Sequence, residues 1–225
     1  MPPLRLKSGN VHVWVVDLES APATPGILSP SELARAGRFR FAKDRRGFIA
    51  SHAALRQILA AYTDLHPASL DFMTLPHGKP ALVSGGLQFN LSHSGELAVV
   101  ALAAGCELGV DIERLRAQVE MEAIARRFFS PSETEALLAY PEPERAPAFF
   151  RCWTRKEAYV KAIGGGLTIS LSSFVVSLEP ARAELLSGVE APWTLHSLDV
   201  HPSYCAALAV ACNPAEISLR RWLPR

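Results

Sequence analysis

Cysteines, net charge and long apolar runs are all scarce in this sequence of 225 residues. Its four cysteines match no CxxC metal pattern. We expect free thiols and no disulfide, with Cys106, Cys205 and Cys212 buried in apolar surroundings. The net charge is +1 and no long Lys/Arg block is present, so nucleic acid is not an expected partner. No run approaches the length of a membrane span, and His12 and Asp17 interrupt the first apolar stretch, so we predict a cytoplasmic protein without signal peptide or membrane contact.

The rest of the composition fits a globular protein with a sizeable core, because 49% of the residues are hydrophobic and 20% are charged. The Ser-Pro-Ser-Glu sequence at Ser29–Glu32 predicts a helix start with Ser29 as N-cap, and a helical region follows from Phe39 to Tyr62. The strands expected in this half are Val11–Leu18, a strand–turn–strand stretch at Asp71–Leu82, and Leu87–Leu91 and Leu97–Ala103 joined by a turn at Ser92–Glu96.

The second half of the sequence repeats this order of elements. The matched pairs are Val16–Glu19 with Val110–Glu113, Leu28–Glu32 with Phe129–Glu133, the helices Phe48–Tyr62 with Ala148–Ile163, and the strands Ser94–Ala103 with Pro202–Ala211. The first two pairs match in sequence and the others in element type and order, which indicates duplication of an α+β unit. We therefore predict two pseudo-symmetric α+β subdomains, residues 1–106 and 107–225, packed as an intramolecular pseudo-dimer with a ligand site between them.

The two matched helices differ in chemistry. In the alignment that the repeat suggests, His52 corresponds to Trp153 and Arg56 to Glu157. The helix of the first half therefore lacks the carboxylate of the second. The Asp17-Leu18-Glu19 copy of the acidic motif has no such helical partner, so we expect it to be a surface or structural feature.

Three carboxylates and a lysine of the second half are candidates for one site. Asp111 and Glu113 alternate with apolar residues, so on a strand both face the same side. Trp153, Glu157 and Lys161 are spaced i, i+4, i+8, which places them in one row on a helix that the following glycines end. Carboxylates are the hard oxygen ligands that Mg²⁺ prefers, and this ion commonly bridges carboxylates to substrate phosphates. The alternative is a solvated strand face and a surface Glu–Lys pair contributing roughly 0.2–0.5 kcal/mol.

Four ordered segments resemble the surfactin-type (Sfp-type) 4′-phosphopantetheinyl transferases over nearly the whole chain. They are FNLSHSG (Phe89–Gly95), GVDIE (Gly109–Glu113), RFFSPSE (Arg127–Glu133) and WTRKEAYVKAIGGGL (Trp153–Leu167). The resemblance implies two pseudo-symmetric halves with coenzyme A between them. It also implies Mg²⁺-dependent transfer of 4′-phosphopantetheine from coenzyme A to a serine of an acyl or peptidyl carrier protein, with release of adenosine 3′,5′-bisphosphate.

The resemblance also implies roles for individual residues. Asp111, Glu113 and Glu157 are implied as the Mg²⁺ ligands and Lys161 as the phosphate-binding lysine. Glu133 is either a catalytic group near the metal or only the capping-box acid of its helix, with Ser130 as N-cap. The general base stays open between Glu157, Glu133 and a metal-bound water.

Further residues are implied in binding coenzyme A. Ser92 and His93 would contact its phosphates, with His93 at the 3′-phosphate, in a polar turn that offers backbone N–H groups to an anion. Lys79 is either a turn lysine or a contact of the adenine and its phosphate. Residue 47, where the resemblance leads us to expect an arginine, is Gly47, so the basic residue that meets the 3′-phosphate stays open. The candidates are Arg35, Arg45 and Arg46, whose alternative is a solvated helix face.

The carrier protein is expected to be acidic, with contacts on the helix after Ser130 and on a mobile segment, Ala139–Pro147. Lys156 is expected to be solvated or to face the carrier.

Two other functions are compatible with parts of the sequence: a binding module for coenzyme A or carrier proteins, which would need no acidic triad, and a Mg²⁺-dependent hydrolase of nucleotide pyrophosphates. Because the duplication supplies its own partner surface, we expect a monomer. The physiological carrier, the pathway and the tolerance for acyl-coenzyme A are open.

Overall fold

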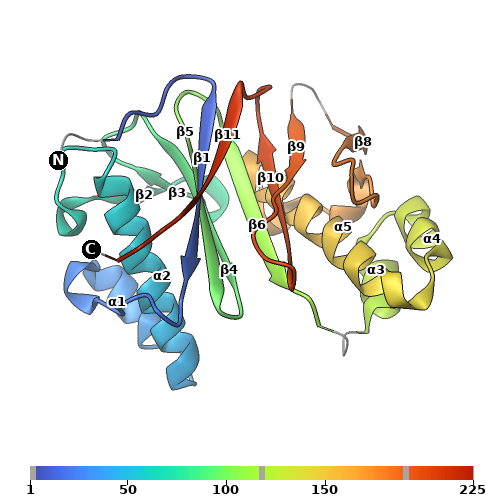
Figure 1. The fold of residues 1–225 in the computed structure, drawn as a ribbon, viewed down its shortest axis with the longest axis horizontal. Helices are drawn as coiled ribbons and strands as arrows, with labels where there is room; N and C mark the ends of the chain where they lie inside the picture. Colours follow the sequence, from blue (N-terminus) through green and yellow to red (C-terminus); the bar gives the residue numbers. More distant parts are fainter. Residues whose placement is uncertain (1–3, 117–119, 190–192, 225) are drawn as a thin grey trace.

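Two α+β halves lie side by side in the computed structural model, which describes residues 4–116, 120–189 and 193–224 (Figure 1). The first half contains β1 (Asn10–Asp17), α1 (Pro30–Ala36), α2 (Ala42–Ala60), β2 (Phe72–Thr74), β3 (Pro80–Leu82), β4 (Gln88–Ser94) and β5 (Leu97–Ala103). The second contains β6 (Leu108–Arg114), α3 (Met121–Phe128), α4 (Pro131–Ala139), α5 (Glu142–Ile163), β7 (Val175–Val176), β8 (Leu185–Ser187), β9 (Thr194–Ser197) and β10 (Tyr204–Val210). The last strand, β11 (Glu216–Arg221), returns to the first half.

The two main sheets form the middle of the molecule. One has the strand order β11-β1-β5-β4 and the other β6-β10-β9. β11 pairs with β1 in parallel, and the other neighbours pair antiparallel. Valines 11, 13 and 15 of β1 pack against β6 and β10 in a core between the sheets. The opposite faces are covered by α2 and α5, so the layers run helix, sheet, sheet, helix (Figure 1). This arrangement confirms the predicted α+β fold of two related units.

Strands β4 and β6 meet along a seam in which side chains replace a backbone ladder. The N–H of Val110 donates to Asn90 Oδ1 at 2.9 Å, that of Ile112 to Ser92 Oγ at 3.4 Å, and that of Arg114 to Ser94 Oγ at 3.1 Å. Every second side chain of β4 therefore accepts from every second amide of β6, in parallel register. We call these contacts the β4–β6 seam. They satisfy buried amides of the second half with side chains of the first.

The repeat predicted from the sequence appears in matched helix starts. Ser29 caps α1 and Ser130 caps α4, and each forms a reciprocal capping box with the glutamate three residues later. Glu32 pairs with Arg56 at 2.7 Å, and Glu133 pairs with Lys156 at 2.8 Å. The predicted alignment of the two long helices is therefore wrong by one residue, because Arg56 corresponds to Lys156 and not to Glu157.

The same two cations also hold equivalent turns. Arg56 donates to the carbonyls of Pro67 and Leu70, and Lys156 donates to those of Leu171 and Phe174. Lys156 is 0% exposed. The expectation that Lys156 is solvated or faces the carrier is wrong, because this turn covers that side of α5.

The expectation of free cysteines is also wrong for one pair. Cys106 and Cys212 form a disulfide, with their Cα atoms 6.3 Å apart. In the antiparallel pairing of β6 and β10, Leu108 lies opposite Val210. Cys106 and Cys212 each stand two residues beyond these partners, so the strand register brings them together. Cys152 and Cys205 are free.

Several element boundaries differ from the predictions. β4 extends through His93 to Ser94, so Ser92 and His93 lie in a strand and not in the predicted turn. α5 already begins at Glu142 and carries Pro147 within it, so residues 142–147 are helical and not the predicted mobile segment. Of the helices that the structure describes, none has the length and apolarity that a membrane crossing requires.

Candidate active site

A close approach of α5 to β6 brings the candidate carboxylates together. A Cβ on Gly109 would stand 2.3 Å from the carbonyl oxygen of Ala158, so only glycine allows the helix to lie this near the strand. Asp111 and Glu113 follow on β6, and Glu157 and Lys161 lie on α5. Lys161 Nζ donates to Asp111 Oδ1 at 2.5 Å. Lys161 of the helical row therefore meets Asp111 of β6, and Glu157 lies one turn before Lys161 on the same helix.

The carboxylates act on one another electrostatically. Burial raises the pKa of Glu157, and the charges of Asp111 and Glu113 raise it further while Lys161 opposes them. Burial also raises the pKa of Glu113; Ser94 opposes this through a hydrogen bond, and Asp111 adds to it. Like charges held near one another in this way favour a cation between them.

One carboxylate oxygen of the buried Asp111 has no hydrogen-bond partner among the described residues. The residue is 4% exposed. Its Oδ1 accepts from Lys161 and, at 2.8 Å, from Ser92 Oγ. Its Oδ2 is buried and has no hydrogen-bond partner among the described residues. A buried carboxylate oxygen without a donor is costly unless a ligand completes it.

The donor set fits Mg²⁺ in chemistry, since it consists of hard carboxylate oxygens. Within the described residues, no three His, Cys, Asp or Glu side chains stand close enough to form a ready-made metal site. The protein thus provides the oxygen donors without a closed coordination shell. This suits an ion that keeps several of its waters and shares its coordination with substrate phosphates.

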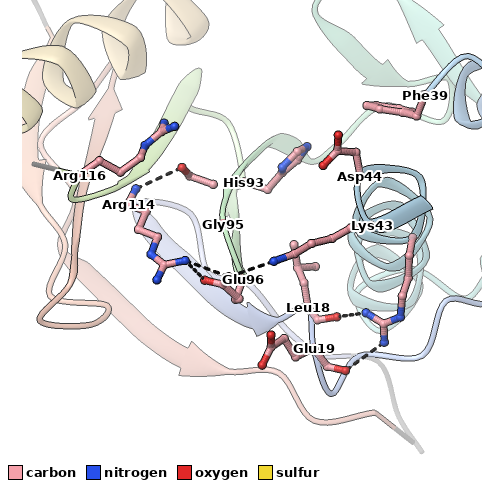
Figure 2. A pocket seen from close by; sticks show the side chains of 13 residues that line it. Leu18, Glu19, Phe39, Lys43, Asp44, His93, Gly95, Glu96, Arg114 and Arg116 are labelled. Atoms are coloured by element: carbon pink, nitrogen blue, oxygen red, sulfur yellow. Dashed lines mark hydrogen bonds and ion pairs between the residues drawn. The ribbon is translucent and has the colours of Figure 1, made fainter. Parts of the chain in front are cut away.

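A pocket of about 480 Å³ is lined from both halves (Figure 2). The candidate carboxylates and Lys161 are not among the described residues that line it, but Ser94 of its wall donates to Glu113. His93 and Asp44 lie next to each other on its wall. Desolvation lowers the pKa of His93, the positive charges of Lys161 and Arg35 lower it further, and Asp44 opposes them. The positive charges of both halves, Arg35 of the first and Lys161 of the second, thus act on His93.

The three candidate arginines have different surroundings. Arg35 is exposed near His93 and lies over the ring of Phe48 at 5.4 Å. Arg46 lines the pocket, but its guanidinium donates to three backbone carbonyls, of residues 18, 19 and 21. Arg45 is exposed on α2 and is not among the described residues that line the pocket. Of the three, Arg35 is the one whose charge acts on His93.

Lys79 ties the two halves together. Its Nζ donates to the carbonyls of Ala162 at 2.6 Å and Leu108 at 3.1 Å. Burial lowers the pKa of Lys79. An ammonium group at the C-terminal end of α5 complements the helix dipole. Lys79 thus fixes the end of the helix that carries Glu157 and Lys161.

Glu133 lies in the interior, with both carboxylate oxygens engaged. Oε2 accepts from the N–H of Ser130 at 2.8 Å, and Oε1 accepts from the N–H of Val176 at 2.8 Å and pairs with Lys156. Glu133 is 1% exposed. This surrounding favours the capping-box alternative over a role near the metal.

Two further groups at the site, Ser94 and Glu96, were not predicted from the sequence. Ser94 Oγ donates to Glu113 Oε2 at 2.7 Å. Glu96 accepts from Lys43 at 3.3 Å and from Arg114 at 2.8 Å at the pocket wall (Figure 2). For Ser94, a signal was present: the alternation of Ser92 and Ser94 matches that of Asp111 and Glu113. For Glu96 we find no sequence signal.

Comparison with known proteins gives matches across the chain. A family model described as the 4′-phosphopantetheinyl transferase superfamily matches residues 107–209, and another, described as 4′-phosphopantetheinyl transferase, N-terminal, matches residues 15–105. The chain is 39% identical over 218 residues to the 4′-phosphopantetheinyl transferase HetI of Nostoc, covering 93% of this chain and 91% of the relative. It is 29% identical over 188 residues to the 4′-phosphopantetheinyl transferase Sfp of Bacillus subtilis, and this match covers 82% of this chain and 83% of the relative. A holo-(acyl-carrier-protein) synthase structure from Bacillus anthracis is similar over 46% of this chain and 93% of that chain, with 21% identity and a TM-score of 0.40.

Proposed function

The chain belongs to the 4′-phosphopantetheinyl transferase superfamily, with relatives of the Sfp type, and on this premise we propose how its residues perform the transfer. It is a transferase that moves phosphopantetheine to carrier proteins. We propose coenzyme A as the donor and a serine hydroxyl of an acyl or peptidyl carrier protein as the acceptor. The serine Oγ bonds to the phosphorus next to pantetheine, the pyrophosphate bond breaks, and adenosine 3′,5′-bisphosphate leaves.

The observation that carries this proposal is the cluster of Asp111, Glu113, Glu157 and Lys161 beside the pocket. Asp111, Glu113 and Glu157 would hold Mg²⁺, and the unpartnered Oδ2 of Asp111 supports this. When bound, the ion would neutralise charge on the pyrophosphate oxygens. Catalysis of phosphoryl transfer consists chiefly of such charge stabilisation and of positioning.

The protein's own groups would act on the substrate as follows. Lys161, paired with Asp111 in this structure, is placed to donate to phosphate oxygens. His93 and Arg35 would bind the phosphates of the nucleotide. We propose Glu157 as the acceptor of the serine proton, because it lies in the cluster whereas Glu133 has both oxygens occupied. Glu133 and Lys156 are then structural residues.

We further propose that the subdomains divide as residues 1–106 and 107–225, with β11 added back to the first sheet. A monomer is proposed because the two halves already bury their sheets against each other. A cytoplasmic location is proposed because coenzyme A is available there. Disulfides are rare in that compartment, so the bond between Cys106 and Cys212 counts against this location.

Incubation with an apo acyl carrier protein, coenzyme A and Mg²⁺ should add one phosphopantetheine to the carrier, and EDTA should prevent it. Intact mass spectrometry measures the gain directly. Fatty-acid, polyketide and peptide carriers should be tried side by side, since the acceptor range is open. Coenzyme A binding without any mass gain on all of them would support a binding module. Coenzyme A breakdown without a carrier would instead support a hydrolase.

Replacing His93 by Ala should raise the KM for coenzyme A by about 10–100-fold and lower kcat much less, because a lost charge-assisted hydrogen bond to a remote phosphate costs about 1.5–3 kcal/mol of binding. The same kinetics with 3′-dephospho-coenzyme A tests the assigned phosphate. The variant and the unmodified protein should have similar KM values for that donor. An equal loss with both donors would remove His93 from the 3′-phosphate.

A further inference from the structure

The carboxylates assigned to the metal lie on the second half, yet side chains of the first half hold them. Ser92 Oγ donates to Asp111 Oδ1 at 2.8 Å, and Ser94 Oγ donates to Glu113 Oε2 at 2.7 Å. Both serines lie on β4, both are less than one-tenth exposed, and both reach across the β4–β6 seam. Each strand carboxylate therefore has one oxygen fixed by a serine of the other subdomain.

The hydroxyl protons of these serines are committed to the carboxylates. Each serine oxygen already accepts a backbone N–H of β6, from Ile112 for Ser92 and from Arg114 for Ser94. Its single O–H is thus left to donate, and it points to the carboxylate. The amide fixes the hydroxyl, and the hydroxyl fixes the carboxylate. For Asp111 this leaves Oδ2 as the oxygen without a partner among the described residues.

We infer that Ser94 is a positioning residue for the metal site: it orients Glu113 from across the β4–β6 seam, as Ser92 orients Asp111. This inference rests on the proposed function, because it assumes that Glu113 serves Mg²⁺. Groups that hydrogen-bond a metal-binding carboxylate preset its direction, and their removal typically costs about 10–100-fold in metal affinity. Ser94 is the sharper test of the two, because Ser92 also contacts Lys161, at 3.0 Å.

The chain offers a matched control at the same seam. Asn90 accepts the N–H of Val110 at 2.9 Å, as Ser94 accepts that of Arg114 at 3.1 Å. Asn90 has its partner amide on Val110, which carries no carboxylate. Asn90→Ala therefore removes a seam hydrogen bond and leaves both carboxylates with their serines. Ser94→Ala removes a seam hydrogen bond together with the donor to Glu113.

The experiment titrates Mn²⁺ into the 225-residue protein without carrier or coenzyme A and measures free Mn²⁺ by electron paramagnetic resonance. Ser94→Ala should raise the Kd for Mn²⁺ about tenfold, Asn90→Ala should change it by less than about twofold, and Ser94→Thr, which keeps the hydroxyl, should restore most of the affinity. Thermal unfolding without metal is measured in parallel. The metal-free stability losses of the two alanine variants should be similar.

Unchanged Mn²⁺ affinity in Ser94→Ala would overturn the inference, and so would an equal loss in Asn90→Ala, because the seam alone would then be the cause. In either case the unmodified protein would still bind Mn²⁺ and modify a carrier, so the proposed function would stand. If the unmodified protein bound no Mn²⁺, the metal assignment would fall and this inference with it. If it bound Mn²⁺ but transferred nothing, only the proposed transferase activity would fall.

Discussion

Replacing Asp111 by Asn should lower kcat for carrier modification by about 10³-fold, equivalent to about 4 kcal/mol. The expected loss is large because the residue combines three features. It is 4% exposed, its Oδ2 is buried without a partner among the described residues, and its Oδ1 pairs with Lys161 at 2.5 Å. Asparagine keeps the shape and one acceptor oxygen but removes the charge that would hold a cation. The measurement is the single-turnover rate at saturating coenzyme A and Mg²⁺.

The duplicated half supplies the matched control. Asp17 occupies the corresponding place in the first acidic motif, but it is exposed, and among the described residues its carboxylate accepts hydrogen bonds from Ser20 and from the N–H of Glu19, both local. Asp17→Asn should leave the transfer rate within about twofold. The free energy of unfolding of Asp111→Asn should change little, because the change also removes a buried, incompletely satisfied charge. A folded Asp111→Asn protein with near-normal turnover would remove Asp111 from the site.

Short-range periodicity explains which parts of the site could be predicted. A strand alternates its faces, so Asp111 and Glu113 had to share one side, and an i, i+4 spacing had to place Glu157 beside Lys161. The two Ser-Pro-Ser-Glu capping boxes are also local, and both form as expected. In each case the geometry is determined by a few neighbouring residues.

The missed features depend on contacts between distant segments. The disulfide follows from the register of β6 against β10, which no local pattern gives. The Ser-His-Ser-Gly sequence has turn chemistry, yet β4 pairs with β5 as far as Ser94 opposite Leu97, so the turn is confined to Gly95 and Glu96. Helical spacing gives the direction of Lys156 but cannot say that the turn at residues 171–174 covers it. β11, too, is recruited by pairing with β1.

The features that the two halves share, compared with those that differ, explain how a duplicated fold has a single site. Both halves keep a glutamate–cation pair that joins a short capped helix, α1 or α4, to the long helix, α2 or α5. The second half adds Asp111, Glu157 and Lys161, and the first half adds β4, whose serines reach these groups. The pair common to both halves belongs to the scaffold. The groups that differ between the halves belong to the proposed chemistry, which is why Glu133 is assigned to the scaffold.

Replacing Glu133 by Gln should lower the free energy of unfolding by about 3–5 kcal/mol, because it leaves the ammonium of Lys156 buried without its counter-charge. Lys156 is 0% exposed and Glu133 1%. Glutamine has a single acceptor oxygen, so it can still accept from the N–H of Ser130 but no longer also from that of Val176, and the loss combines the ion pair with one hydrogen bond. Urea unfolding at pH 7 measures it. The double variant Glu133→Gln/Lys156→Met should recover part of the loss, since both buried charges are then gone while the carbonyls of Leu171 and Phe174 lose the donor that Lys156 supplies.

The copy in the first half again provides the control. Glu32→Gln breaks the equivalent pair with Arg56. Because the Glu32 side chain is 14% exposed, water can partly replace its carboxylate as the partner of Arg56. The free energy of unfolding should therefore fall by less, about 1–2 kcal/mol. Activity measurements distinguish a structural role of Glu133 from a role in the reaction. If it is a scaffold residue, kcat per folded molecule stays within about twofold in Glu133→Gln at a temperature where the variant is folded. A fall in kcat of a hundredfold in a fully folded variant would show instead that Glu133 acts in the reaction, and Glu157 would no longer be the sole candidate to accept the serine proton.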